Sequence, residues 1–181
     1  MVLKEEQGAL FYKSWFSLLK YANYKYDIVD DFTEATHSEG ISLEKTYKVA
    51  NRIWDDVSII DEYLEMFSDK MSEEERDIVV RWKNVVRGTF IVDRHLKKGS
   101  ILISEKKKVY LVKGIYSSWR EMLGDLPTPQ MVNAALIPFQ GEIICDGLIH
   151  PYGVCLDKNL SDESKRIYME AKASNKIYTC I

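Results

Sequence analysis

The hydrophobic pattern changes its period near Gly88, and this change constrains the fold more than any other feature of the chain. Before Gly88, apolar residues recur every three or four positions, which is typical of helices that bury one face. After it come three runs rich in β-branched and aromatic residues, TFIVDRHL, SILISE and KVYLVKGIY, separated by Lys-Lys-Gly (97–99) and Lys-Lys-Lys (106–108). The pattern predicts an α+β protein, with a helical layer over residues 1–87 and a mostly antiparallel sheet or partly open barrel over residues 88–181.

Three helices are predicted in the first region. The first spans about residues 4–26 and has a largely aromatic face. The second spans residues 43–67, follows Ser42 as its expected N-cap, and carries the longest apolar stripe of the chain. The third begins after Ser72, which forms a complete capping-box signature with Glu75.

Two segments beside these helices have a different character. Residues 30–41 (DDFTEATHSEGI) are polar and acidic, which predicts a loop. The third helix is expected to end at Gly88, and the alternative is a helix that continues through Phe90 and Leu96 in place of the first strand. Because no repeat or low-complexity linker separates the helical and β regions, they are expected to share an interface as one compact unit.

The most distinctive segment of the β module is AALIPFQGEIICDGLIHPYGVC, residues 134–155. Gln140-Gly141, between two apolar runs, predicts a hairpin turn. Pro138 cannot donate a hydrogen bond to a ladder, so it is expected at a sheet edge or a bulge. Asp146-Gly147 predicts a bulge or a close approach of another group to the backbone. Residues 150–153 (HPYG) are expected to form a turn before a short strand.

Three further elements complete the predicted module. These are a short helical turn after Ser117 or Ser118, a helix over residues 162–174 with Ser161 as its N-cap, and a final strand within residues 177–181.

Composition narrows the class of protein. The chain has 181 residues, of which 46% are hydrophobic, so it can bury a sizeable core. The N-terminus lacks the pattern of a signal peptide, and no apolar run is long enough to span a bilayer. Its three cysteines are an odd number without dense spacing, which favours a reducing compartment. The sequence therefore predicts a cytoplasmic protein with no membrane association.

Charge is distributed unevenly along the chain. Residues 27–77 carry 16 acidic and 5 basic side chains, whereas residues 81–113 carry 10 basic and 2 acidic ones. A basic segment of this kind can bind nucleic acid, and Arg94, Lys97 and Lys98 are the candidate contacts. The favoured interpretation is that the acidic helices and the basic strands partly neutralise each other, because the isoelectric point of 5.7 differs from that of a dedicated nucleic-acid binder.

Motifs with a known catalytic or cofactor-binding mechanism are absent from the sequence. No Gly-rich phosphate loop, zinc-protease helix or nucleophile elbow is present, so no cofactor is expected. The sharpest pattern is Cys145-x4-His150-x4-Cys155, whose residue types suit zinc although its spacing is not a usual one. Read as an enzyme, the same stretch offers Cys145 as nucleophile, His150 as base and Asp146 as the group that orients it. Read as structure, both cysteines are small buried hydrophobes, and this interpretation is preferred over a metal site or a catalytic site.

Residues 135–147 (ALIPFQGEIICDG) resemble the "LLPF-x-G-x-IIYDG" stretch of a group of uncharacterised bacterial proteins. In that group, segments similar to KVYLVKGI (108–115) and IYMEAKA (167–173) flank the stretch, so the resemblance covers roughly residues 88–181. Some members also carry a SEC-C zinc motif, whose cysteine cluster is absent here. The group usually has Tyr at the position of Cys145, so the resemblance implies that Cys145 is neither a ligand nor a nucleophile. It implies a β module without an assigned activity.

Taken together, the sequence favours a non-catalytic binding or interaction protein whose β module holds a protein, peptide or small-molecule partner. Pro138, Asp146 and Gly147 mark the expected place of contact. The first alternative is a nucleic-acid-associated regulatory protein that uses residues 81–113. The second is a hydrolase that uses Cys145 and its neighbours.

Overall fold

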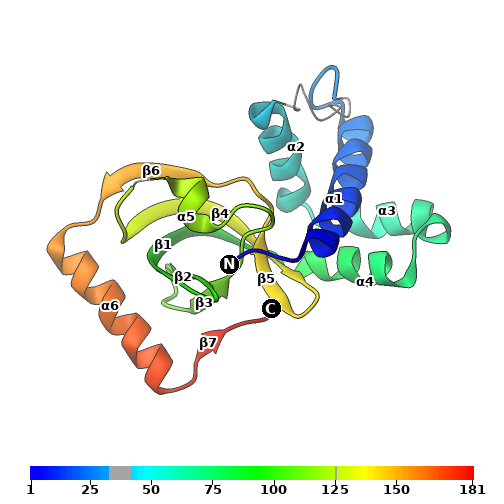
Figure 1. Ribbon diagram of the computed structural model, residues 1–181. Coiled ribbons are helices and arrows are strands. Elements are labelled where there is room, and N and C mark those ends of the chain that lie inside the picture. Colours follow the sequence, from blue (N-terminus) through cyan, green and yellow to red (C-terminus); the bar gives the residue numbers. More distant parts are fainter. Residues whose placement is uncertain (33–41, 125) are drawn as a thin grey trace. The chain divides into compact units, whose positions relative to one another are not determined.

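A computed structural model describes residues 1–32, 42–124 and 126–181, with the backbone alone described at Cys155 (Figure 1). The described residues form six α-helices and a seven-stranded, mostly antiparallel sheet, which confirms the predicted α+β class. The chain divides into two compact units. The helical unit comprises residues 6–83, and the sheet unit combines residues 1–5 with residues 84–181.

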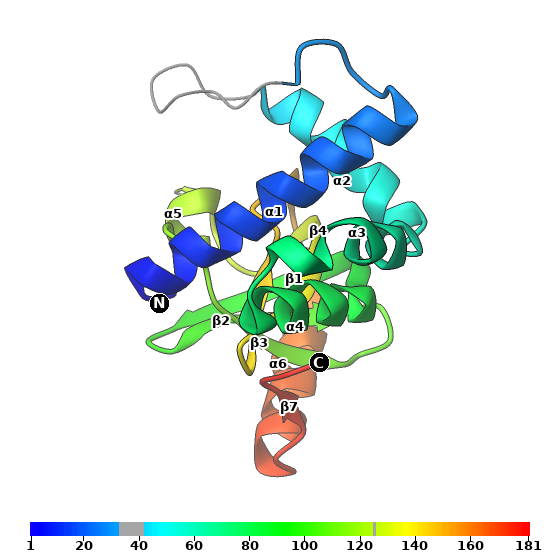
Figure 2. The ribbon, with the colours of Figure 1, turned by 90° about the vertical axis from the view of Figure 1, so that its right-hand side faces the viewer.

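The helical unit is built around α1 (Glu5–Tyr26), which runs beside α2 (Leu43–Asp55) and α4 (Glu73–Arg81) (Figures 1 and 2). The predicted aromatic face of α1 is buried, since Trp15 stacks on Trp54 of α2 with ring centroids 5.0 Å apart. Tyr21 of α1 meets Tyr63 of α3 (Ile59–Phe67) at 5.6 Å. The first helix is therefore confirmed within one residue, and its aromatic face serves to pack the unit.

The prediction of one continuous helix over residues 43–67 is wrong. The chain leaves the helical conformation at Asp56, between α2 and α3. The Asp56 carboxylate accepts hydrogen bonds from the backbone N–H of Ser58 at 3.2 Å and from its hydroxyl at 2.6 Å. Short polar side chains that bond to nearby backbone in this way compete with the helical hydrogen bonds. Each of the two helices buries its own apolar face, so apolar residues recur at helical spacing on both sides of the break.

Two short 3₁₀ turns, η1 (Ser68–Lys70) and η2 (Trp82–Asn84), flank α4. At the start of α4 the predicted capping box is present in full, with Ser72 and Glu75 exchanging side-chain and backbone hydrogen bonds. Ser42 precedes α2 as expected but makes no side-chain cap. The predicted loop over residues 30–41 falls largely on residues 33–41, which lie outside the described residues.

The sheet has the strand order β5-β4-β1-β2-β3-β7, and β6 also pairs with β4. All pairs are antiparallel except β3 with β7. The strands are β1 (Val86–Leu96), β2 (Gly99–Ser104), β3 (Val109–Val112), β4 (Gln130–Phe139), β5 (Glu142–Cys145), β6 (His150–Cys155) and β7 (Ile177–Tyr178). A single bridge between Lys113 and Ile144 joins the end of β3 to β5, with the Lys113 N–H donating to the carbonyl of Ile143 at 2.9 Å. The sheet is thus open but strongly curved.

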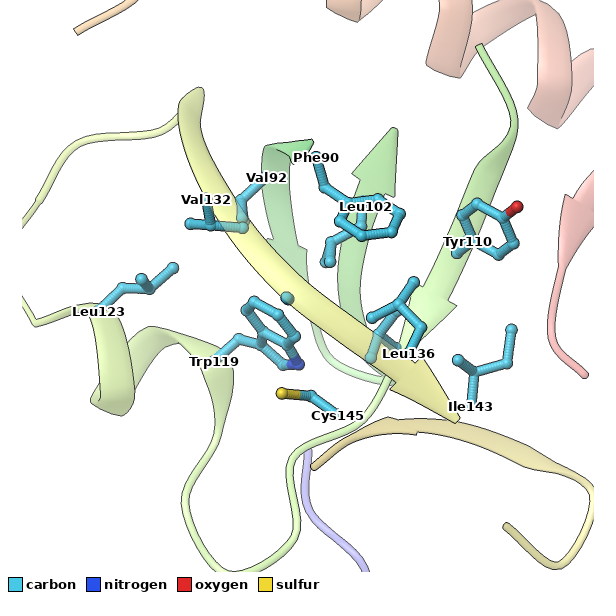
Figure 3. Packing of buried hydrophobic residues seen from close by; sticks show 12 residues of the cluster. Phe90, Val92, Leu102, Tyr110, Trp119, Leu123, Val132, Leu136, Ile143 and Cys145 are labelled. Carbon is cyan, nitrogen blue, oxygen red and sulfur yellow. The ribbon is translucent and has the colours of Figure 1, made fainter. Parts of the chain in front are cut away.

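Each face of the sheet packs a separate apolar cluster. One cluster collects inward side chains of five strands together with Trp119 and Leu123 of α5 (Trp119–Leu123) (Figure 3). On the other face, α6 (Lys158–Ala173) covers β1, β2 and β3 through Tyr168 and Ile167. Alternate residues of the strands supply the two faces, as the period of a strand requires.

Several boundaries differ from the predicted ones. The strand β1 already begins at Val86, so the alternative of a helix through Phe90 and Leu96 is wrong. Residues 150–153, expected as a turn, open the strand β6, because they pair with β4. Ser161 is not the N-cap of the last helix; Asp157 is, and it accepts the N–H of Leu160 at 2.8 Å. The Gln140-Gly141 hairpin and the short helix after Ser118 are confirmed.

No helix among the described residues combines the length and the apolar character needed to cross a bilayer.

Candidate functional site

The Cys145–His150–Cys155 pattern does not converge in space. Cys145 ends β5 and Cys155 ends β6, and these consecutive strands both pair with the same edge of β4 and not with each other. Cys145 pairs with Leu136 and Cys155 with Gln130, six residues apart and therefore about 20 Å apart along the strand. Across the part of the chain that the structure describes, no three His, Cys, Asp or Glu side chains gather as a metal site.

Cys145 lies in the apolar cluster of the sheet unit, beside Trp119 and Leu136 (Figure 3). Only 2% of its surface is exposed. Burial, reinforced by the neighbouring Asp146 carboxylate, raises the pKa of the Cys145 thiol well above its usual value. A reactive cysteine needs a stabilised thiolate, whereas this environment favours the neutral thiol. His150 is exposed at the start of β6, so the arrangement does not support a nucleophile and base pair.

Asp146 and Gly147 form the predicted interruption of the sheet edge. Cys145 pairs with Leu136 of β4, and His150 pairs with Asn133. Between these two pairs lie two residues of β4 but four residues of the segment that joins β5 to β6. The Asp146 carboxylate accepts the N–H of Leu148 at 3.0 Å, and Gly147 bends the chain with a φ of 88°. Asp146 is buried, and its Oδ1 accepts both the N–H of Leu148 and the thiol of Cys145, at 3.5 Å, which gives it a structural role in shaping the edge.

Pro138 lies at the end of β4 that extends beyond β1. It faces Ile143 of β5, while the last β1–β4 pair is Val86 with Leu136. The missing N–H of proline therefore falls where one side of the strand has no β1 partner, which is the tolerated place for proline in a sheet.

Arg94, the first of the candidate nucleic-acid contacts, binds to other residues of the sheet unit. Its Nε donates to the carboxylate of Asp93, whose side chain is 3% exposed, and its guanidinium lies 4.2 Å from the ring centroid of Tyr168 on α6. The other oxygen of Asp93 accepts the hydroxyl of Ser164 at 2.8 Å. Asp93 is the extra residue of a bulge between β1 and β2. These contacts attach α6 to the sheet.

The basic segment 81–113 is partly neutralised by acidic side chains within each unit. Lys107 pairs with Glu163 and Lys113 with Glu142, each at 2.7 Å. Lys83 pairs with Asp61 at the same distance within the helical unit. Lys97 and Lys98 lie at the exposed turn between β1 and β2 and form no salt bridge with the described residues.

The helical unit contains a cavity that the sequence interpretation did not identify. Its volume is about 450 Å³, and it is lined by α1, α3, η1 and α4. Six of the lining side chains define its character: the rings of Tyr21, Tyr63 and Phe67, and the ammonium groups of Lys13, Lys20 and Lys70. The cavity therefore combines an aromatic wall with a cationic rim.

The aromatic wall is a packed triad. Tyr63 and Phe67 have ring centroids 5.2 Å apart, and Tyr21 lies 5.6 Å from Tyr63 and 5.7 Å from Phe67. Burial raises the pKa of both phenols, and Glu62 adds to the effect at Tyr21 while the nearby Ser17 side chain opposes it at Tyr63. Both hydroxyls thus stay protonated at neutral pH and can donate or accept hydrogen bonds.

Two polar residues that line the cavity differ in whether their side chains have hydrogen-bond partners. Glu75 is fully engaged: Lys13 lies 2.6 Å from one oxygen, and the N–H of Ser72 donates to the other at 2.9 Å. Ser14 is 3% exposed, yet its hydroxyl has no hydrogen-bond partner among the described residues. The Ser14 oxygen is shielded from solvent, so its unpaired state belongs to the packed interior beside the cavity.

A signal of this cavity was present in the sequence. Lys13, Ser17, Lys20 and Tyr24 recur at helical spacing on α1, beside the buried stripe of Trp15. The sequence analysis identified an aromatic face on this helix and no cavity beside it. The cavity itself depends on residues from α3 and α4 that no local pattern connects.

Comparison with known proteins adds no assignment, since the chain matches no protein-family model, no curated protein and no solved structure.

Proposed function

We propose that this protein is a non-catalytic binding protein and that the cavity of the helical unit holds a small organic ligand. The observation that carries the proposal is the aromatic wall of the cavity, where the rings of Tyr21, Tyr63 and Phe67 pack together beside a space of ligand size. The volume of about 450 Å³ lies within the usual range of small-molecule sites.

The proposal moves the binding site from the β module, where the sequence favoured it, to the helical unit. Asp146 and Gly147 are explained by the bend they form, and Pro138 by the end of the β1–β4 pairing. The non-catalytic part is supported by Cys145, which is buried as a neutral thiol, whereas His150 is exposed and pairs with β4 three residues away from the partner of Cys145.

The proposal includes a cytoplasmic setting in a bacterial cell. Cys145 and Cys180 are free thiols, as is usual in a reducing compartment. The bacterial origin rests on the resemblance of residues 135–147 described above.

A neutral fluorescent probe tests the cavity directly. N-phenyl-1-naphthylamine, whose emission rises in apolar surroundings, is titrated into the full chain. We expect saturable binding to one site. Ser17→Trp places a large ring at the exposed edge of the cavity and should weaken binding at least about 10-fold, a change of about 1.4 kcal/mol.

Lys172→Trp, on an exposed part of α6, is the matched control and should leave the affinity unchanged. No saturable binding, or equal binding by the wild type and Ser17→Trp, overturns the proposal.

A further inference from the structure

The sheet unit carries a cavity of its own, of about 390 Å³, where the end of α6 leads into β7 beside β3 (Figure 1). Val109 of β3 and Tyr178 of β7 line it together with α6. Four cationic side chains and one carboxylate also line it: Lys107, Lys108, Arg166, Lys176 and Glu170. The cavity therefore has an excess of positive charge.

Two of these cations are already neutralised within the sheet unit. Lys107 pairs with Glu163 at 2.7 Å, and Arg166 pairs with Glu170 at the same distance. Lys108 and Lys176 are exposed and form no salt bridge with the residues that the structure describes. These two lysines therefore carry the uncompensated charge of the cavity.

The pairing of β3 with β7 places the two lysines side by side. The strands are parallel, and Val109 pairs with Ile177. Lys108 and Lys176 each precede that pair by one residue. Neighbouring strands lie about 4.8 Å apart, and like charges at opposite positions destabilise a sheet. An anion between the two ammonium groups would remove this repulsion.

The carbonyl groups at the end of α6 are bonded to the backbone that follows. Those of residues 170–172 accept the N–H groups of residues 174–176 at 2.8–3.4 Å. The Nζ of Lys108 lies 5.5 Å from the ring centroid of Tyr178, whose side chain is 43% exposed. The ammonium group is thus placed at the open side of the cavity, where a ligand can reach it.

We propose that this cavity binds a phosphate monoester, with the phosphate group between Lys108 and Lys176. A phosphate monoester carries a charge of about −1.5 to −2 at neutral pH, which matches the two uncompensated lysines. Lysine binds phosphate as a point charge. The lining is largely polar, so the organic part of the ligand is small and polar, as in a sugar. This site lies in the sheet unit and is independent of the cavity of the helical unit.

Glucose 6-phosphate and glucose 6-sulfate form a matched pair that differs in charge above the second pKa of the phosphate, about 6. Binding to the full chain is measured by calorimetry at low ionic strength. At pH 8 we expect the phosphate to bind at least about 10-fold more tightly than the sulfate. At pH 5 both carry about one negative charge, and the preference should fall below about 3-fold. The sulfate, whose charge is constant, controls for any change in Glu163 and Glu170.

The double variant Lys108→Gln/Lys176→Gln should lower the affinity for glucose 6-phosphate at pH 8 at least about 10-fold, because it removes both uncompensated charges. Lys165→Gln/Lys172→Gln, at exposed positions of α6 outside the cavity, removes the same charge and should change the affinity less than about 2-fold. Equal losses in the two variants, or no saturable binding by the wild type, overturn the site. Equal binding of phosphate and sulfate at pH 8 overturns the assignment of a dianion.

A phosphate monoester can be a soluble sugar phosphate or the headgroup of phosphatidic acid, and sedimentation with vesicles separates the two sources. The full chain is mixed with phosphatidylcholine vesicles that contain phosphatidic acid. Sedimentation that is lost in Lys108→Gln/Lys176→Gln assigns the lipid headgroup. Binding of glucose 6-phosphate without sedimentation assigns a soluble ester.

Discussion

At the scale of single residues, burial decides what Cys145 can do. Its thiol lies among apolar side chains and its pKa is raised, so very little thiolate is present at neutral pH. Cys180 is exposed. We therefore expect iodoacetamide to label Cys180 in the native protein and to leave Cys145 unmodified, as measured by peptide mass spectrometry after brief treatment at pH 7.5.

Denatured protein provides the control, since both thiols should then react. Native labelling of Cys145 at the rate of Cys180 would contradict the burial described here and would reopen the hydrolase hypothesis.

Arg94 provides a second prediction for a single residue. Arg94→Ala removes the cation from the buried Asp93 carboxylate and leaves the neutral hydroxyl of Ser164 bonded to its other oxygen. Breaking a fully buried pair costs about 3–5 kcal/mol, and since the Arg94 side chain is 32% exposed we expect a smaller loss of about 2 kcal/mol in the free energy of unfolding. Urea denaturation measures it.

Lys97→Ala and Lys98→Ala, at the exposed turn, are the matched variants and should change stability by less than about 0.5 kcal/mol. Equal effects at all three positions would refute the structural role of Arg94. A charge-reversal test of nucleic-acid binding should accordingly use Lys97 and Lys98 and leave Arg94 intact, because a variant of Arg94 can lose binding by losing its fold.

At the scale of elements, two serines that precede helices differ in their capping. Ser72 accepts the N–H of Glu75, whereas Ser42 makes no side-chain cap. We expect Ser72→Ala to lower the free energy of unfolding of the helical unit by about 1 kcal/mol. Ser42→Ala should change it by no more than a few tenths, and thermal or urea unfolding followed by circular dichroism distinguishes the two. A larger effect at Ser42 would show that the capping box contributes little.

The same capping box makes the stability of α4 depend on pH. Burial tends to raise the pKa of Glu75, but Lys13 and Ser72 outweigh it, and the pKa is lowered overall. A carboxyl whose pKa is lower in the folded state contributes stability that is present above its unfolded pKa, about 4.3, and is lost as the pH falls through the folded value. We expect the destabilising effect of Glu75→Gln, measured by urea unfolding, to be largest at pH 7 and to shrink below about pH 4. An effect that grows toward acid would contradict the sign.

Secondary structure could be predicted from sequence where one local pattern sets it. The period of Trp15 and its neighbours located α1, and the Gln140-Gly141 turn located the β4–β5 hairpin. The break at Asp56 depends on a hydrogen bond to Ser58 that competes with a strong apolar stripe. The strand β6 depends on pairing with β4, which is distant in sequence, so its Pro and Gly suggested a turn.

The candidate site was less predictable because it is also formed by residues that are distant from one another in sequence. Its lysines and tyrosines on α1 are visible as a helical stripe, but Tyr63 and Phe67 come from another helix. The unpaired state of Ser14 is a property of the packed unit, since a serine within a helix is unremarkable in sequence.

At the scale of the whole molecule, the sheet unit is discontinuous in sequence. Residues 1–5 belong to it, residues 6–83 form the helical unit, and the chain returns to the sheet at residue 84. Backbone hydrogen bonds attach the N-terminal residues to the sheet unit. The N–H of Leu3 donates to the carbonyl of Gly114 at 3.0 Å, and the N–H of Gly114 donates to the carbonyl of Met1 at 3.2 Å. The first residues of the chain thus help to fix the segment that follows β3.

This arrangement makes the sheet sensitive to a residue far from it in sequence. Leu3 is 6% exposed, so Leu3→Ala removes buried apolar contacts of the sheet unit, and we expect the unit to lose about 2 kcal/mol of stability. Hydrogen exchange should speed up in β3 and at Gly114, although no residue there has changed. Glu6→Ala, exposed three residues later, should leave that exchange unaltered. If Leu3→Ala changed exchange only within residues 6–83, the N-terminal residues would belong energetically to the helical unit, and the discontinuous sheet unit would have to be abandoned.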